Sequence, residues 1–188
     1  MRFFCLCFIF LGANTARAQG VLDPETDPFA RGRWHVEFAL QAALEAWNYN
    51  SSHEELYGLI EGVTYGLRDG LVLTARQRTY YVSQRFNDSW VLGLTSGLRW
   101  RIAQSGRTST FLQFDLGVSS TSIAIPRRGT RFNYLLIGGG GILVRLKPRL
   151  SLITTLELIH ISNLNLKGPD RNPDIEAIGP SLGLVVGF

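Results

Sequence analysis

The chain has almost no cysteine, and the little it has lies at the start. Among 188 residues only Cys5 and Cys7 are cysteines, within the opening segment MRFFCLCFIFLGANTARAQG. Its charged start at Arg2, short apolar core and small residues at Ala16 and Ala18 are typical of a signal peptide. A membrane anchor is the alternative, but the apolar stretch is shorter than the ~20 residues of a spanning helix. Cleavage after Ala18 would leave a mature chain without disulfides, thiol catalysis or cysteine-bound metal.

Long hydrophobic runs and an excess of one charge sign are also absent. No later segment offers the ~18 uncharged apolar residues that a membrane-spanning helix needs. Loss of Arg2 and Arg17 with the signal peptide lowers the net charge from +4 to +2, which is too even to indicate nucleic-acid binding. A secreted chain this low in charge and rich in aromatics and glycine is either a soluble β-sandwich or an outer-membrane barrel.

Apolar residues alternate with polar or small ones through most of the mature chain. From Trp34 to Ala46 the even positions are apolar, whereas the odd positions include Glu37, Gln41 and Glu45. A period of two indicates strands with one apolar face, and these runs are longer than typical soluble strands. We predict eight strands, over residues 33–47, 56–67, 71–81, 89–102, 108–119, 131–145, 149–162 and 176–188.

The connections between these strands alternate in length. Those at 68–70, 103–107 and 147–148 are short, and the other four are longer. Short turns at one end and long loops at the other are the layout of a transmembrane barrel. We therefore predict an all-β fold, an eight-stranded antiparallel transmembrane β-barrel of the outer membrane, over residues 33–188. A periplasmic arm at 19–32 precedes it, because its two Asp-Pro pairs disfavour a strand.

Several further features fit this barrel. Trp90 and Trp100 share a strand face and could form interfacial girdles, although they could also be core residues of a sandwich. The terminal sequence GLVVGF resembles the last strand of bacterial outer-membrane barrels, which implies the barrel-assembly machinery as a partner and the Gram-negative outer membrane as the location.

The glycines at 138–141 lack the lysine of a phosphate loop and predict a thin strand segment. The sequence RRGTR at 127–131 falls in an outer loop, where it meets either lipid phosphates or solvent. Paired lumen charges are expected from Glu37, Glu45, Arg99, Arg101 and Asp115.

A candidate catalytic group lies near the C-terminus, in LELIHISNLNLKGPDRNPDIEAIG. His160, Ser162 and Glu176 share strand parity with apolar residues, so they are expected to face the lipid, where a polar group indicates function. Residues i and i+2 of a strand point the same way, so His160 can activate Ser162 as a base, and Glu176 can orient the imidazole. Asn163 could donate its amide to an oxyanion. A bulge at Pro180 would reverse the parity of Glu176.

The residues HISN followed by NPDIE resemble the lipid A 3-O-deacylase family of outer-membrane lipases. The resemblance implies that His160 is the base, Ser162 the nucleophile, Glu176 the orienting acid and Asn163 an oxyanion-hole residue. It also implies a serine esterase that removes an ester-linked acyl chain from lipid A of lipopolysaccharide. Asn172 and Pro173 match the family's turn, whereas Leu164 and Asn165 replace residues that are usually small.

Other functions remain open at this point. A non-enzymatic barrel for adhesion or envelope integrity is the main alternative, and an acyltransferase is a third. No metal or organic cofactor is expected, since His35 and His53 have no clustered partners. The expected partners are lipid A and outer-membrane lipids, and the sequence leaves open whether the protein forms a homodimer.

Overall fold

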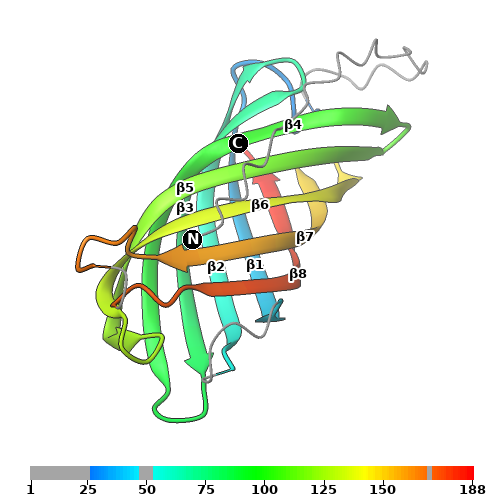
Figure 1. Cartoon of the computed structure of the whole chain (residues 1–188). Coiled ribbons are helices and arrows are strands. Elements are labelled where there is room, and N and C mark those ends of the chain that lie inside the picture. The colour runs from blue at the N-terminus through cyan, green and yellow to red at the C-terminus, as the bar shows by residue number, and fades with distance from the viewer. Residues whose placement is uncertain (1–25, 47–52, 169–170) are drawn as a thin grey trace.

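The computed structural model describes residues 26–46, 53–168 and 171–188, and its strands close into a barrel (Figure 1). Each strand pairs antiparallel with its sequence neighbours, and β1 pairs with β8. The predicted eight-stranded barrel is therefore confirmed. The predicted signal peptide at 1–18 lies outside the described residues, as does the arm up to residue 25. The strands are β1 (Trp34–Glu45), β2 (Glu55–Arg68), β3 (Leu71–Ser83), β4 (Ser89–Ser105), β5 (Thr108–Ile125), β6 (Thr130–Lys147), β7 (Leu150–Ser162) and β8 (Ile175–Gly187).

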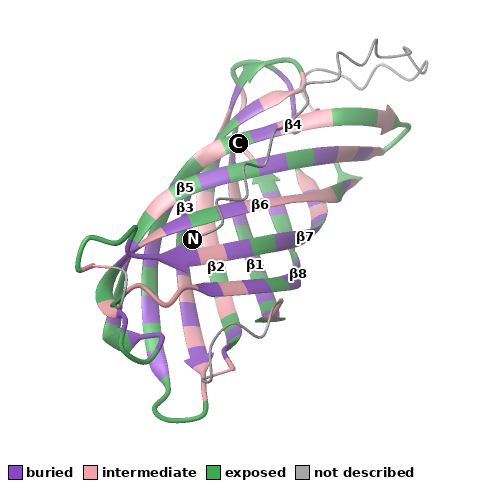
Figure 2. Ribbon diagram, viewed as in Figure 1, coloured by how far each residue is buried: buried purple, intermediate pink, exposed green. Residues whose placement is uncertain are grey.

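Buried and exposed residues alternate along the strands, as the banding in Figure 2 shows, so successive side chains face the lumen and the outer wall in turn. In β1 the odd residues from His35 to Ala43 are buried, whereas Leu40 is 69% exposed. Trp90 and Trp100 both lie on the outer face of β4. The described residues contain no helix long and apolar enough to cross a membrane.

One strand boundary differs from the prediction. The sequence indicated a strand end near residue 119 and a long loop up to 130, but β5 continues to Ile125, and only residues 126–129 separate it from β6. The Ser- and Thr-rich stretch stays extended because its hydroxyls bond to neighbouring strands. Thr121 Oγ1 donates to Arg131 O at 3.2 Å, and Ser122 Oγ accepts from Trp90 N at 3.0 Å. Hydroxyl content was thus misread as loop chemistry.

The lumen is filled in layers. Buried ion pairs occupy the middle, with Arg76 and Asp115 2.6 Å apart and Arg78 and Glu157 2.9 Å apart. Apolar clusters lie on either side of this charged layer: one includes Leu56, Tyr80, Ile125, Ile159 and Ile175, and the other Phe29, Val72, Phe111, Leu143 and Ile153.

The predicted lumen charges are paired, but at different heights. Glu37 lies 2.8 Å from Arg99 inside the barrel, and Asp115 also contacts Arg78 at 3.0 Å. Arg101 instead pairs with Asp27 of the N-terminal arm at 2.8 Å, and Glu45 with His53 at 3.1 Å. The interior is therefore closed by side chains rather than open as a pore.

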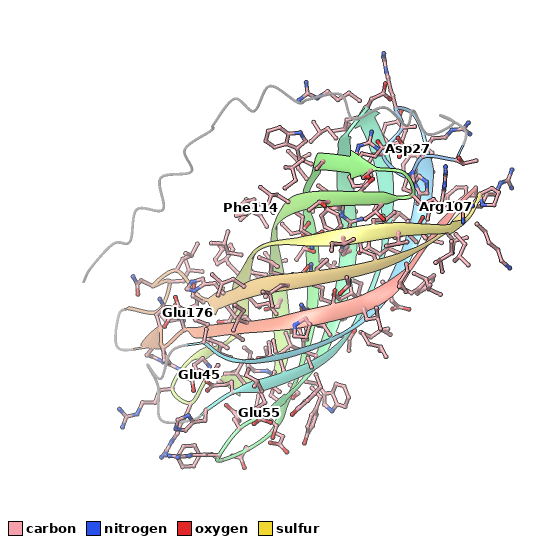
Figure 3. The ribbon with its side chains drawn as sticks, turned by 90° about the vertical axis from the view of Figure 1, so that its right-hand side faces the viewer. Asp27, Glu45, Glu55, Arg107, Phe114 and Glu176 are labelled. Carbon is pink, nitrogen blue, oxygen red and sulfur yellow. The ribbon has the colours of Figure 1, made fainter. Side chains whose placement is uncertain are left out.

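The described part of the N-terminal arm, from residue 26 on, packs into one end of the barrel. Phe29 is 1% exposed and packs on Phe111. The Arg101 guanidinium stacks over the Phe29 ring, 5.1 Å from its centre. Asp27 and Arg107 lie at this arm end (Figure 3). The C-terminus lies there too, since Phe188 N donates to Trp34 O at the start of β1. The opposite, loop end carries Glu45, Glu55 and Glu176 (Figure 3).

Candidate active site

The β7–β8 hairpin brings two of the predicted site residues together. His160 is the direct register partner of Glu176, so both side chains leave the same face of adjacent strands. Pro180 sits opposite Leu156 in an unbroken register, and the ladder to β1 resumes with the same register on either side of it. No bulge therefore reverses the parity of Glu176.

The imidazole of His160 lies between the hydroxyl and the carboxylate. Its Nε2 is 3.0 Å from Ser162 Oγ, and its Nδ1 is 3.5 Å from Glu176 Oε1. The second distance exceeds the ~2.6–3.2 Å of a tight catalytic hydrogen bond, but such contacts are often looser without substrate. Ser162 is 3% exposed, whereas the side chains of His160 and Glu176 are 27% and 30% exposed. The hydroxyl is thus buried, whereas the imidazole and the carboxylate reach the surface.

A second acid, which the sequence prediction missed, lies beside the same ring nitrogen. Asp174 Oδ2 is 4.0 Å from His160 Nδ1. The signal was present, because Asp174 precedes Glu176 by two residues and an extended chain places both on one face. The ligand atoms of His160, Asp174 and Glu176 lie within 4.8 Å of one another, so these residues could hold a metal ion.

Asn163 leaves the strand where the chain turns. Its backbone N–H donates to Asn172 Oδ1 at 2.8 Å, which ties the start of the loop to the NPDIE segment. Its amide donates to Thr130 Oγ1 at 3.1 Å and to Arg171 O at 2.6 Å, and its Oδ1 is buried without a hydrogen-bond partner among the described residues. The amide therefore does not face Ser162 here, and its oxyanion role stays a prediction.

The next two residues adopt left-handed backbone conformations. Leu164 has φ 51° and Asn165 φ 62°. Such a conformation costs roughly 1–2 kcal/mol for a residue with a Cβ, and asparagine tolerates it better than leucine. Glycine, which has no Cβ, would fit this turn without strain. The departure at Leu164 is therefore accommodated by the backbone at an energetic cost.

The wall around the site is apolar. Tyr134 pairs with Ser162 and Leu136 with His160 across the β6–β7 ladder, and Leu136 and Leu158 are exposed on the outer face. A hydroxyl, an imidazole and a carboxylate therefore meet on the lipid-facing wall near the loop end. Fold and site together define an outer-membrane β-barrel with a Ser-His-acid constellation on its outside.

Comparisons with known proteins agree with this class. The family model described as "Lipid A 3-O-deacylase (PagL)" matches residues 15–185, and the chain belongs to this family. No curated protein matches the chain.

Solved structures share the fold. The outer membrane enzyme PagL has a TM-score of 0.54 at 17% identity, covering 80% of this chain and 99% of that one. Neisserial surface protein A has a TM-score of 0.66 at 13% identity, covering 82% and 97%. The outer membrane protein OprG from Pseudomonas aeruginosa has a TM-score of 0.54 at 11% identity, covering 86% and 99%.

Proposed function

We propose that this protein is a serine esterase that removes an ester-linked 3-hydroxyacyl chain from lipid A in the outer leaflet. The observation that carries the proposal is the 3.0 Å contact of His160 Nε2 with Ser162 Oγ on the outer wall. A site on this wall meets its substrate by diffusion within the membrane. Family membership supports lipid A as the substrate.

The reaction runs in two acyl-transfer steps. Ser162 Oγ attacks the ester carbonyl carbon while His160 Nε2 takes the hydroxyl proton, and the C–O bond to the sugar breaks as His160 returns that proton to the leaving oxygen. Water, deprotonated by His160, then cleaves the acyl-serine ester. This releases the free hydroxy fatty acid and restores Ser162.

Glu176 orients the imidazole and stabilises its charged form, because its carboxylate faces Nδ1. Asp174 adds a second negative charge on the same side of the ring. The tetrahedral intermediate needs hydrogen-bond donors at its oxygen, and we assign these to the Asn163 segment. Its amide must exchange Thr130 or Arg171 for the oxyanion when substrate binds.

The proposal also fixes the orientation in the membrane. The loop end faces the outside, where lipopolysaccharide resides, and the arm end faces the periplasm together with the C-terminus. After removal of the signal peptide the chain would reach the membrane through the barrel-assembly machinery, which reads the terminal aromatic strand.

Ser162→Ala tests the proposal. Mass spectra of lipid A from cells that produce the wild type should show loss of one hydroxyacyl chain, and the variant should show an unchanged lipid A, since alanine cannot attack the ester. Ser151→Ala is the matched control, because Ser151 lies on the same strand but faces the lumen. Full activity of Ser162→Ala, at equal amounts of heat-modifiable barrel, would overturn the assignment. A mass gain would indicate an acyltransferase.

A further inference from the structure

A pocket at the loop end lies next to the candidate active site and is not part of it. It has a volume of about 280 Å³ and is formed by the β3–β4 loop and the tip of the β5–β6 hairpin. This volume is near the lower limit for ligand sites, so the pocket suits one group of a larger molecule. Its lining consists of Gln84, Phe86, Asn87, Ile123, Ala124, Arg127 and Arg128.

The pocket is positively charged. Arg127 lies with its guanidinium 4.3 Å from the centre of the Phe86 ring, so the aromatic face holds one cation at the rim. Neither Arg127 nor Arg128 forms an ion pair with a carboxylate within the described part of the chain. The nearby acid of the β3–β4 loop, Asp88, is engaged by the Tyr81 hydroxyl and the Gln84 N–H, which lower its pKa. The two guanidinium groups thus remain available to an anion.

The backbone places Arg128 in an unusual conformation. Its φ is 73°, a left-handed value that few residues with a Cβ adopt, within the tight turn closed by the Gly129 N–H to Pro126 O bond of 2.7 Å. Strained backbone of this kind is concentrated at ligand-binding sites. Asparagine or glycine would be the residue expected for the turn alone.

The same hairpin contacts the candidate site through Asn163. Thr130, which begins β6 directly after the turn, accepts a hydrogen bond from the Asn163 amide. The pocket lies between the β3–β4 loop and the end of β5, and Ser162 ends β7, so the β5 side of the pocket is about two strand spacings of ~4.8 Å from Ser162. This separation is comparable with the breadth of a disaccharide headgroup.

Aromatic residues on the outer wall below the pocket indicate how deep the pocket lies relative to the membrane. Trp90 is 58% exposed on that wall and packs against Tyr81. Aromatic residues on the outer face of a barrel concentrate at the membrane–water interface. A pocket just beyond this aromatic pair therefore lies at the height of lipid headgroups.

We propose that Arg127 and Arg128 form a subsite for a phosphate group on the sugar headgroup of the lipid substrate. Guanidinium forks match the geometry and charge of a phosphate. Binding there would hold the headgroup while the acyl ester lies at Ser162. This inference rests on the proposed function for its kinetic test but not for its binding test.

The kinetic test compares lipid A that carries both phosphates with chemically dephosphorylated lipid A in mixed micelles. For the double variant Arg127→Ala, Arg128→Ala we expect a loss of about 10- to 100-fold in kcat/KM on the phosphorylated lipid, mainly through KM, and little change on the dephosphorylated one. The variant Arg127→Lys, Arg128→Lys should recover part of the loss. The control Arg107→Ala, Arg149→Ala removes the same charge from exposed residues at the arm end and should behave as wild type. An equal loss on both lipids would overturn the proposal.

The binding test separates this proposal from the esterase assignment. Ser162→Ala protein in detergent should bind phosphorylated lipid A more tightly than dephosphorylated lipid A, with an affinity that falls as salt rises. Adding the two arginine substitutions should abolish the preference. If the wild type hydrolyses no lipid A but this preference is present, the esterase assignment fails and the phosphate subsite stands. If hydrolysis is normal and no preference exists, the subsite is wrong.

Discussion

At the scale of single residues, the candidate site depends on strand parity. His160 and Glu176 meet because they are register partners, and Ser162 reaches the imidazole because it lies two residues further on the same face. The acid position is doubled, since Glu176 and Asp174 lie 3.5 Å and 4.0 Å from the same ring nitrogen. Two carboxylates around one imidazole predict that neither alone is indispensable.

Removing one acid should therefore harm the enzyme less than removing the base. We expect Glu176→Gln to lower kcat/KM about 10- to 100-fold and Asp174→Asn by less, whereas His160→Ala should cost about 10⁴-fold. The double variant Asp174→Asn, Glu176→Gln should lose more than the product of the two single effects, because each acid partly replaces the other. Deacylation rates at equal folded amounts measure this. A loss with Glu176→Gln as large as that of His160→Ala would contradict a shared role.

Metal ions should inhibit rather than support the reaction. An ion held by His160 Nδ1, Asp174 and Glu176 would leave the ring proton on Nε2, and Nε2 could then no longer accept the proton of Ser162. We expect activity to survive EDTA and to fall reversibly with Zn²⁺, and Asp174→Asn should weaken this inhibition. Activity that disappears in EDTA and returns with a divalent cation would show instead that the reaction needs a metal.

At the scale of elements, the glycine run in β6 shows two different constraints on adjacent positions. A Cβ on Gly139 would meet Leu156 O at 2.3 Å and Glu157 Cα at 3.0 Å, because the β7 backbone passes close on the lumen side. A Cβ on Gly138 would meet only Phe114 Cδ2, at 3.9 Å, on the outer wall. Close strand packing, which the sequence predicted for this segment, thus excludes a side chain at Gly139 but leaves room for one at Gly138.

This difference gives a matched pair of substitutions. Gly139→Ala should force β6 and β7 apart and lower the yield of folded barrel several-fold, whereas Gly138→Ala should fold normally. The fraction of protein that migrates as the compact, heat-modifiable form in gel electrophoresis measures the yield. Equal yields for both variants would show that the β6–β7 spacing adapts to an added methyl group.

At the scale of the whole molecule, the lumen and the outer wall divide the polar residues unequally. Ion pairs occupy the middle of the lumen, yet the wall, besides the candidate site, also carries a polar pair between strands, Glu61 on β2 and Gln77 on β3. Glu61 faces outward midway along its strand, with Phe38 on its other side. A carboxyl group on a lipid-facing wall costs free energy in a depth-dependent way.

Glu61→Leu should therefore stabilise the barrel, by about 1 kcal/mol, since it exchanges a lipid-facing carboxyl for an apolar side chain. Urea unfolding of protein folded into lipid vesicles measures the change. Glu55→Leu is the control, because Glu55 lies at the loop end and should change stability little. Destabilisation by Glu61→Leu would show that the hydrogen bond from Gln77 outweighs the cost of a carboxyl on the wall.

The sequence by itself determined the class of fold and singled out the candidate site. Alternating hydrophobicity gave all eight strands because a strand between lipid and lumen must show a period of two. The same parity placed His160 and Ser162 on one face, since an i and i+2 relation is local, and in the last strand it predicted an outward-facing Glu176. The predicted end of the fifth strand was wrong, because hydroxyl groups in the Ser- and Thr-rich end of β5 bond to neighbouring strands and the local sequence carries no signal of these bonds.

Only the tertiary structure decided what depends on strands meeting across the barrel. The register set Glu176 directly opposite His160 despite Pro180, and the loop conformation turned the Asn163 amide toward Thr130 and Arg171. The approach of the β3–β4 loop to the β5–β6 hairpin created the pocket around Arg127 and Arg128. Hydrophobic periodicity specifies which face a side chain occupies, but distances between residues far apart in sequence follow from register and closure, which the chain acquires only when the whole sheet has formed.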